Sequence, residues 1–135
     1  MYLSCMTPSP SWPPSRWRSD GPGDIAIMVA GYPAEMDKFL EDAWRSAGYI
    51  FSEEPFKRRR EFFNVRAVKS VSKDSGTDIP GQGVWKNTIF NSSFYTFGIE
   101  RYMTTMDFAA VFDVAANAHY DQIYILVNTE QYGGG

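Results

Sequence analysis

The run Asp121–Asn128, near the carboxyl end of the 135-residue chain, constrains the fold more than any other stretch of the sequence. Its apolar side chains alternate between the two sides of an extended strand: Ile123, Ile125 and Val127 on one, Tyr124 and Leu126 on the other. A strand that is apolar on both faces is typical of the middle of a sheet covered on both sides. Because ligands of open α/β sheets bind beyond the carboxyl ends of the strands, a functional site is expected after Asn128.

Other segments carry the patterns of further strands and helices. A continuous apolar run at 24–30 predicts a second buried strand, and a more polar run at 64–71 predicts a strand nearer an edge. Pro33 suits the first position of a helix. That helix carries an apolar stripe made of Met36, Phe39, Leu40, Ala43, Trp44 and Ala47. Its other face carries the charge pairs Lys38/Asp42 and Glu41/Arg45 at the i, i+4 spacing.

Two shorter helices are predicted, with a long loop at 72–86 between them. One begins at Pro55 and ends near Phe63. The other begins at a capping box, Thr104–Asp107, and buries a stripe of Phe108, Val111, Phe112 and Ala115. The order of elements predicts an α/β fold with a mostly parallel or mixed twisted sheet and packed helices over residues 24–135. Residues 1–23 are rich in proline and serine and are expected to form a disordered lead-in.

Charge and hydropathy exclude several classes of protein. The net charge of −3 argues against a nucleic-acid binder. The basic run Lys57–Arg60 is flanked by Glu53, Glu54 and Glu61, so a solvated helix face is favoured over a phosphate site. No run of about 18 apolar residues is present, which argues against a membrane span. The residues before Met6 do not make a complete signal peptide, although Leu3–Cys5 is similar to the end of a lipoprotein signal.

Few residues are available for common catalytic or metal sites. Cys5 and His119 are the one cysteine and the one histidine, so the chain lacks the ligands of an ordinary zinc site. A serine hydrolase is disfavoured because Gly-x-Ser-x-Gly is absent and His119 is expected at the amino end of its strand. The turn Val29–Pro33 fits either a tight turn or an anion site at a helix start.

The carboxylates and the terminal glycines differ in their expected place on the sheet. Asp24 and Asp121 begin their strands, at the end opposite the expected site, whereas Glu35 and Glu130 lie nearer to it without an evident catalytic partner. The run Tyr132–Gly135 is either a flexible tail or a turn at the rim of a cleft, where glycine permits close approach of the backbone.

Short stretches in a fixed order resemble the zinc metallopeptidase family typified by bacterial IgA-specific metalloendopeptidases. The resemblance covers roughly residues 24–135. The stretches are Gly31–Met36, Glu54–Phe56, Phe63–Val65, Ser75–Pro80, Gly98–Arg101 and the closing segment from Tyr120 to Gly135.

The resemblance implies the amino-terminal subdomain of a zincin-like catalytic domain, truncated before its zinc-binding helix. In that family two histidines of H-E-x-x-H bind zinc, and the glutamate acts as general base on the metal-bound water. The motif is absent here, so no catalytic or metal-binding residue is carried over and the chain is expected to bind no cofactor itself. Zinc is implied for the full-length parent. Asn128, Tyr132, Gly133 and Gly134 are expected to approach the substrate cleft.

The expected function is therefore that of an inactive fragment of a peptidase whose parent cleaves peptide or protein substrates. The resemblance also implies a secreted or cell-envelope parent. The alternative is a non-catalytic α/β module that binds a ligand over the carboxyl strand ends. If the last strand lacks a neighbour, its uncovered edge is expected to cause self-association.

Overall fold

The computed structural model describes residues 2–6, 23–33 and 36–134 of the chain. Its strands are β1 (Tyr2–Met6), β2 (Gly23–Ala30), β3 (Phe63–Val68) and β4 (Gln122–Val127). The α-helices are α1 (Met36–Ile50) and α2 (Phe108–Ala115). Three short 3-10 helices are η2 (Lys57–Phe62), η3 (Pro80–Gln82) and η4 (Thr96–Gly98). The predicted α/β fold is confirmed.

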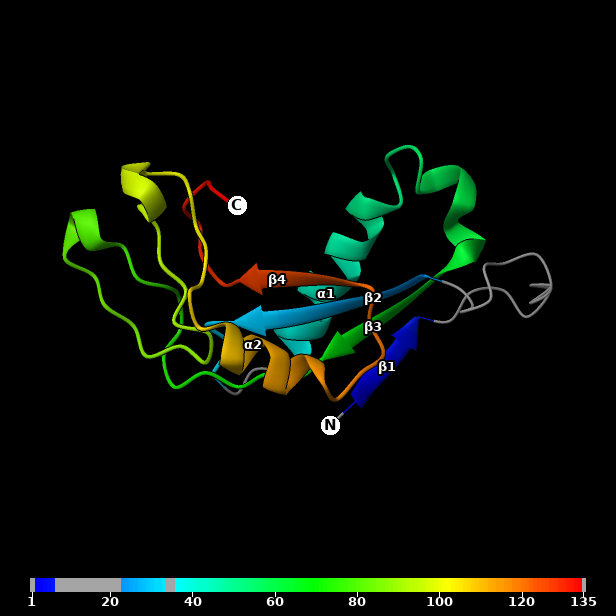
Figure 1. The fold of residues 1–135 in the computed structure, drawn as a ribbon, viewed down its shortest axis with the longest axis horizontal. Helices are drawn as coiled ribbons and strands as arrows, with labels where there is room; N and C mark the ends of the chain where they lie inside the picture. Colours follow the sequence, from blue (N-terminus) through cyan, green and yellow to red (C-terminus); the bar gives the residue numbers. More distant parts are fainter. Residues whose placement is uncertain (1, 7–22, 34–35, 135) are drawn as a thin grey trace.

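The four strands form one mixed sheet in the order β1-β3-β2-β4. β2 pairs in parallel with both β3 and β4, and β1 pairs antiparallel with β3. The carboxyl ends of β2, β3 and β4 therefore meet at one edge of the sheet, where the irregular loops and the end of the chain also gather (Figure 1). This edge is where the sequence placed the site.

β2 is the buried centre of the sheet, and its alternating side chains feed two cores. Ile25, Ile27 and Val29 join Phe39 of α1 in the core on one face. Ala26, Met28 and Ala30 join the core on the other face, with Val111 and Ala115 of α2. α1 thus lies behind the sheet and α2 in front of it (Figure 1). Coverage on both faces explains why residues 24–30 are apolar throughout.

β4 differs from its predicted central position. It pairs with β2 on one side, and none of the described residues pairs with its other side, so it lies at an edge of the sheet. Its two faces are nevertheless covered: Tyr124 and Leu126 pack towards the α1 core, and Ile123, Ile125 and Val127 towards the α2 core. An apolar pattern on both sides of a strand indicates that both of its faces are covered. It does not indicate whether both of its edges are paired, so it also fits an edge strand between two helices.

The amino-terminal part of the chain contributes one strand that was not predicted. Residues 1–23 were expected to form a disordered lead-in, but Tyr2–Met6 form β1 and pair with β3. Residues 7–22 of the predicted lead-in lie outside the described residues. The free edge of β3 offers unpaired backbone groups to an extended segment of almost any sequence, so composition is a weak guide to such pairing.

Both helices begin later than predicted, and each exposes part of its predicted apolar stripe. Trp44 of α1 is 54% exposed, and Phe108 and Phe112 of α2 are 55% and 54% exposed. Asp107 is itself the N-cap of α2, accepting a hydrogen bond from the Ala110 amide at 3.1 Å, so the box does not begin at Thr104. None of the helices in the described part of the chain has the length and apolar character needed to cross a membrane.

Candidate functional site

Asn128 joins three parts of the structure at the carboxyl edge of the sheet. Its amide nitrogen donates to the Ala30 carbonyl at 3.1 Å and continues the pairing of β4 with β2. Its side-chain Nδ2 donates to the Gly31 carbonyl at 3.2 Å and to Ser75 Oγ at 2.9 Å. Its Oδ1 accepts from Lys38 Nζ of α1 at 3.1 Å. The predicted site residue thus fixes where the chain leaves the sheet.

The turn after β2 brings two backbone segments into close contact. Gly31 has a φ of +75°, and a Cβ at this position would lie 2.2 Å from the Gly76 carbonyl oxygen. The Gly76 amide donates back to the Gly31 carbonyl at 3.3 Å. Of the two interpretations of Val29–Pro33, the described geometry fits the tight turn, because the close neighbour of Gly31 is protein backbone.

A buried carboxylate, Asp42, organises the polar side chains beside Asn128. Asp42 is 8% exposed and its Oδ2 accepts from Tyr32 Oη at 2.5 Å and from Lys38 Nζ at 2.7 Å. Its Oδ1 accepts from Arg45 Nη2. The predicted pair of Lys38 with Asp42 is confirmed, but Arg45 bonds Asp42 at the i, i+3 spacing and not Glu41.

This environment changes the ionisation of both Asp42 and Tyr32. Burial raises the pKa of Asp42, but the hydrogen bonds from Lys38 and Tyr32 and the charges of Lys38 and Arg45 outweigh it, so the pKa lies below its ordinary 3.8. Burial, reinforced by the bond to Asp42 and by its negative charge, raises the pKa of Tyr32 above its ordinary range. Asp42 therefore stays ionised and Tyr32 stays a hydrogen-bond donor at neutral pH.

The closing residues of the chain lie against an irregular segment rather than in open solvent. A Cβ on Gly133 would lie 2.4 Å from the Arg101 carbonyl oxygen and 2.5 Å from Phe94 Cε1. The Gly134 amide donates to that same Arg101 carbonyl at 3.0 Å. Of the two interpretations of Tyr132–Gly135, the described residues thus fit a turn better than a free tail, although Tyr132 is 85% exposed.

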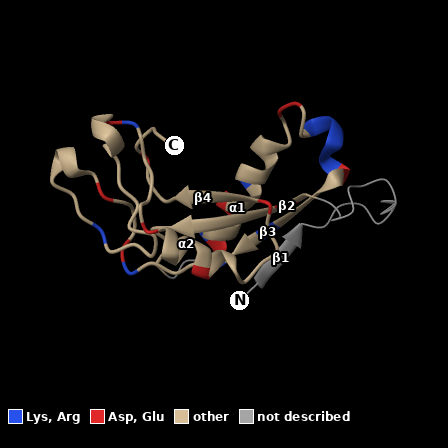
Figure 2. Cartoon of the chain, viewed as in Figure 1, with Lys and Arg blue, Asp and Glu red and all other residues tan. Residues whose placement is uncertain are grey.

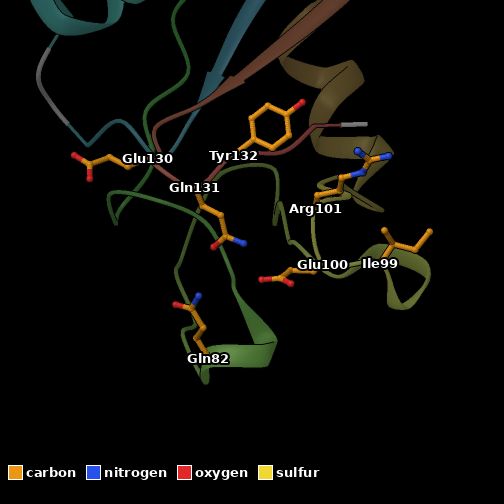
Figure 3. A pocket seen from close by; sticks show the side chains of 7 residues that line it. All are labelled: Gln82, Ile99, Glu100, Arg101, Glu130, Gln131 and Tyr132. Carbon is orange, nitrogen blue, oxygen red and sulfur yellow. The ribbon is translucent and has the colours of Figure 1, made fainter.

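An open hollow of about 750 Å³ lies between this turn and two loops. Its lining includes Gln82, Glu100, Arg101, Gln131 and the predicted Tyr132. Figure 3 shows the Gln131 amide and the Glu100 carboxylate directed into the space between the loops, whereas Glu130 points away from it. The hollow therefore offers both hydrogen-bond donors and acceptors.

A second hollow of about 580 Å³ follows the free edge of β4. One wall is the strand itself, from Gln122 to Val127, and the other includes Met103–Thr105. The predicted glycines Gly133 and Gly134 close one side. The four predicted residues therefore do not share one cavity: Asn128 lies at the strand end, Tyr132 at the first hollow and the glycines at the second.

Three residues of the loops beside these hollows have unusual backbone conformations. Asn91, Tyr95 and Phe97 all have φ between 46° and 62°, a region that non-glycine residues rarely occupy. A Cβ on Gly81 would lie 2.3 Å from Cζ of the Tyr95 ring, so the two loops pack closely. Such backbone strain persists where surrounding contacts enforce it and is common at functional sites.

Asp24, Asp121 and His119 lie at the amino ends of the strands, opposite the carboxyl edge, as predicted. The Asp24 amide donates to Asp121 Oδ2 at 2.8 Å, and the Asp121 amide to the Asp24 carbonyl at 2.7 Å. Arg66 bonds Asp24 Oδ1 and donates to the His119 carbonyl at 3.3 Å. These contacts tie the strand starts together, and Asp24 and Asp121 have structural partners there.

The basic run Lys57–Arg60 lies in η2, far from the carboxyl edge (Figure 2). All four side chains are exposed, as expected of a solvated face. Arg58 pairs with Glu54 at 2.9 Å, and the Arg60 guanidinium lies 4.3 Å from the centre of the Phe51 ring. Arg58 and Arg60 therefore contact residues close to the basic run in the sequence.

The side chains that the structure describes do not form a zinc site of the usual kind. Catalytic zinc is held by three protein ligands, commonly histidines with a carboxylate. No group of three His, Cys, Asp or Glu residues comes together in the described residues. His119, the one histidine of the sequence, is exposed just before β4, at the amino end of that strand. Glu35 lies outside the described residues.

Substitution of Gly133 by alanine should loosen the closing turn, because the new Cβ collides with Arg101 and Phe94. We expect a loss of about 1–3 kcal/mol in the free energy of unfolding, as for overpacked sites, or release of the turn. Hydrogen exchange of the amide at position 134 should accelerate in either case. Gly134→Ala is the matched control, since nothing lies within 4 Å of its added Cβ. Equal exchange in the two variants would contradict the described turn.

Asp42 should make stability depend on pH in the acidic range. A folded-state pKa below the unfolded value means that the ionised carboxylate stabilises the fold above pH 3.8, and that this contribution is lost as pH falls through the folded pKa. Urea unfolding at a series of pH values should show this decline. Asp42→Asn should cost about 1–3 kcal/mol at neutral pH, as expected for loss of charged hydrogen bonds, and should flatten the acid decline. An unchanged slope would exclude Asp42 as its source.

Two comparisons with known proteins bear on what this scaffold belongs to. A comparison with curated proteins gives no match. The sequence profile described as IgA Peptidase M64 matches residues 21–135, which includes β2, β3, β4 and both α-helices. The match begins just before β2 and covers the carboxyl edge with Asn128 and the closing glycines. The chain therefore belongs to the IgA peptidase M64 family.

Proposed function

We propose that residues 24–135 are the amino-terminal scaffold of a zinc metallopeptidase catalytic domain, whose carboxyl sheet edge borders the cleft for a peptide or protein substrate. The observation that carries the proposal is the family match over residues 21–135. The geometry supports it, because Asn128 and Tyr132–Gly134 lead from the end of β4 to two hollows lined by polar loops. Secretion or attachment to the cell envelope is proposed on the same family grounds.

We further propose that the 135-residue chain does not hydrolyse peptides by itself. Hydrolysis of the type implied by the family needs two histidines and a glutamate on one helix, and the sequence contains one histidine. What this chain supplies is a rigid wall: Lys38 and Ser75 hold the Asn128 side chain, and Arg101 holds the closing turn. Its role is to position substrate beside catalytic groups that it does not itself carry.

The purified chain should contain much less than one zinc per molecule and should not cleave casein. Metal content by mass spectrometry and release of labelled peptides, with and without chelator, test this directly. Stoichiometric zinc, or turnover that a chelator abolishes, would contradict the proposal that the chain alone is inactive. The alternative is a non-catalytic α/β module that binds a ligand over the carboxyl strand ends.

Self-association through the free edge of β4 is the remaining part of the proposal. β4 has the sequence Gln-Ile-Tyr-Ile-Leu-Val. It contains neither a charged residue nor a proline, the two kinds of residue that protect natural edge strands from pairing with another chain. Its side chains after Gln122 are half-buried, so its outward backbone groups lie beside apolar surface. A second copy that pairs there would satisfy the groups and cover the surface.

Sedimentation velocity over a range of concentrations should therefore show association of the chain. Gln122→Lys places a charge at the exposed start of β4 and should weaken the association several-fold, since charge on an edge strand opposes pairing. Ser52→Lys, at an exposed turn beyond α1, is the matched control and should associate as the unmodified chain does. A strictly monomeric sample at all concentrations would exclude this part of the proposal.

A further inference from the structure

A small polar hollow of about 160 Å³ lies at the carboxyl ends of β2 and β4, beside α1. Its lining includes Tyr32, Lys38, Asp42 and Arg45, together with Asn128 and Thr129. Ligands of open α/β sheets approach at this end of the strands. The hollow shares Leu126, Val127 and Thr129 with the hollow along β4, but its charged lining residues belong to neither of the two larger hollows.

Among the described residues, the lining of the hollow carries one positive charge in excess. Lys38 and Arg45 are the cations of this described lining, and Asp42 is its carboxylate. Asp42 is 8% exposed and turns both of its oxygens to donors of the cluster. The low pKa of Asp42 keeps it charged, so it anchors both cations while cancelling the charge of one. One further negative charge would make the hollow neutral.

Both cations retain hydrogen-bond donors for a ligand. An ammonium group has three donors and a guanidinium five. Within the described residues, Lys38 Nζ uses two, towards Asp42 and Asn128, and Arg45 uses one, towards Asp42. Their side chains remain 47% and 65% exposed although their partner is buried. Lys38 Nζ is also held 5.1 Å from the centre of the Tyr32 ring, which restricts its position.

We propose that this hollow binds a carboxylate, which Arg45 and Lys38 hold through their free donors. A planar guanidinium matches the two oxygens of a carboxylate, and a single carboxylate neutralises the excess charge. The volume of about 160 Å³ also admits the carbon atoms that carry the group. Assigning the carboxylate to a peptide, as an acidic side chain or a free carboxyl terminus, rests on the proposed function. The carboxylate site itself does not depend on catalysis.

Titration of the 135-residue chain with small peptides, followed by amide NMR, tests the proposal. N-acetyl-aspartate N-methylamide presents a side-chain carboxylate, and N-acetyl-glycyl-glycine presents a terminal one. N-acetyl-asparagine N-methylamide is the neutral analogue. We expect saturable shifts at Lys38, Asn128 and Thr129 with one or both acids, weakened by salt, and no saturation with the neutral analogue. Which acid binds more tightly identifies the source of the carboxylate.

Arg45→Gln and Lys38→Gln should each weaken binding by about tenfold or more, the effect of losing one charged hydrogen bond. Arg58→Gln is the matched control, because Arg58 is an exposed cation paired with Glu54 on the same chain but outside the hollow. Thermal unfolding verifies that each variant is folded. Equal binding by the Arg45 and Arg58 variants, saturation by the neutral analogue, or binding of inorganic phosphate alone would overturn the proposal. Because no turnover is measured, an inactive chain that binds the acids supports this site while leaving the peptidase proposal to its own test.

Discussion

The structure depends on the double pairing of β2, which has a parallel neighbour on each side and a helix on each face. Residues Ile25–Ala30 are no more than 2% exposed. Parallel strands need long crossover connections, and these connections supply α1 and α2 as the covering layers. Once β2 is fixed, the turn at Gly31 and the end of β4 at Asn128 are fixed with it.

Serine hydroxyls complete the end of this strand and form a link that the sequence did not indicate. Ser70 Oγ accepts from the Val29 amide at 3.1 Å and donates to the Val29 carbonyl. Ser72 Oγ accepts from the Gly31 amide at 2.9 Å and from Ile89 at 3.1 Å. The bonds to Val29 and Gly31 join residues 41 positions apart and the bond from Ile89 joins residues 17 positions apart, so no local periodicity indicates them. Residues 72–86 therefore had the composition of an ordinary loop, although part of that segment is built into the sheet end.

Segments whose burial imposes a continuous apolar pattern could be predicted from the sequence, whereas contacts between distant residues could not. The strands at 23–30 and 122–127 and the helix at 36–50 were evident because burial imposes apolar spacing along a continuous segment. The edge position of β4 was not predicted, because apolar spacing indicates whether the faces of a strand are buried and not how many strands pair with it. The burial of Asp42 was missed because a charge at an i, i+4 spacing usually indicates a solvated face. The loop walls near Tyr95 depend on distant contacts, such as the close approach of Gly81, and left no local pattern.

Two carboxylates hold basic side chains at opposite ends of the sheet, and comparing them indicates where binding chemistry can reside. At the amino ends, Arg66 and Asp24 are 22% and 21% exposed, and both also bond neighbouring groups that close the strand starts. At the carboxyl ends, Asp42 is buried but the cations that it holds remain largely exposed. The first pair is mostly shielded from solvent, whereas the second holds its cations at the surface. The same kinds of residue thus stabilise one edge of the sheet and leave the other able to bind.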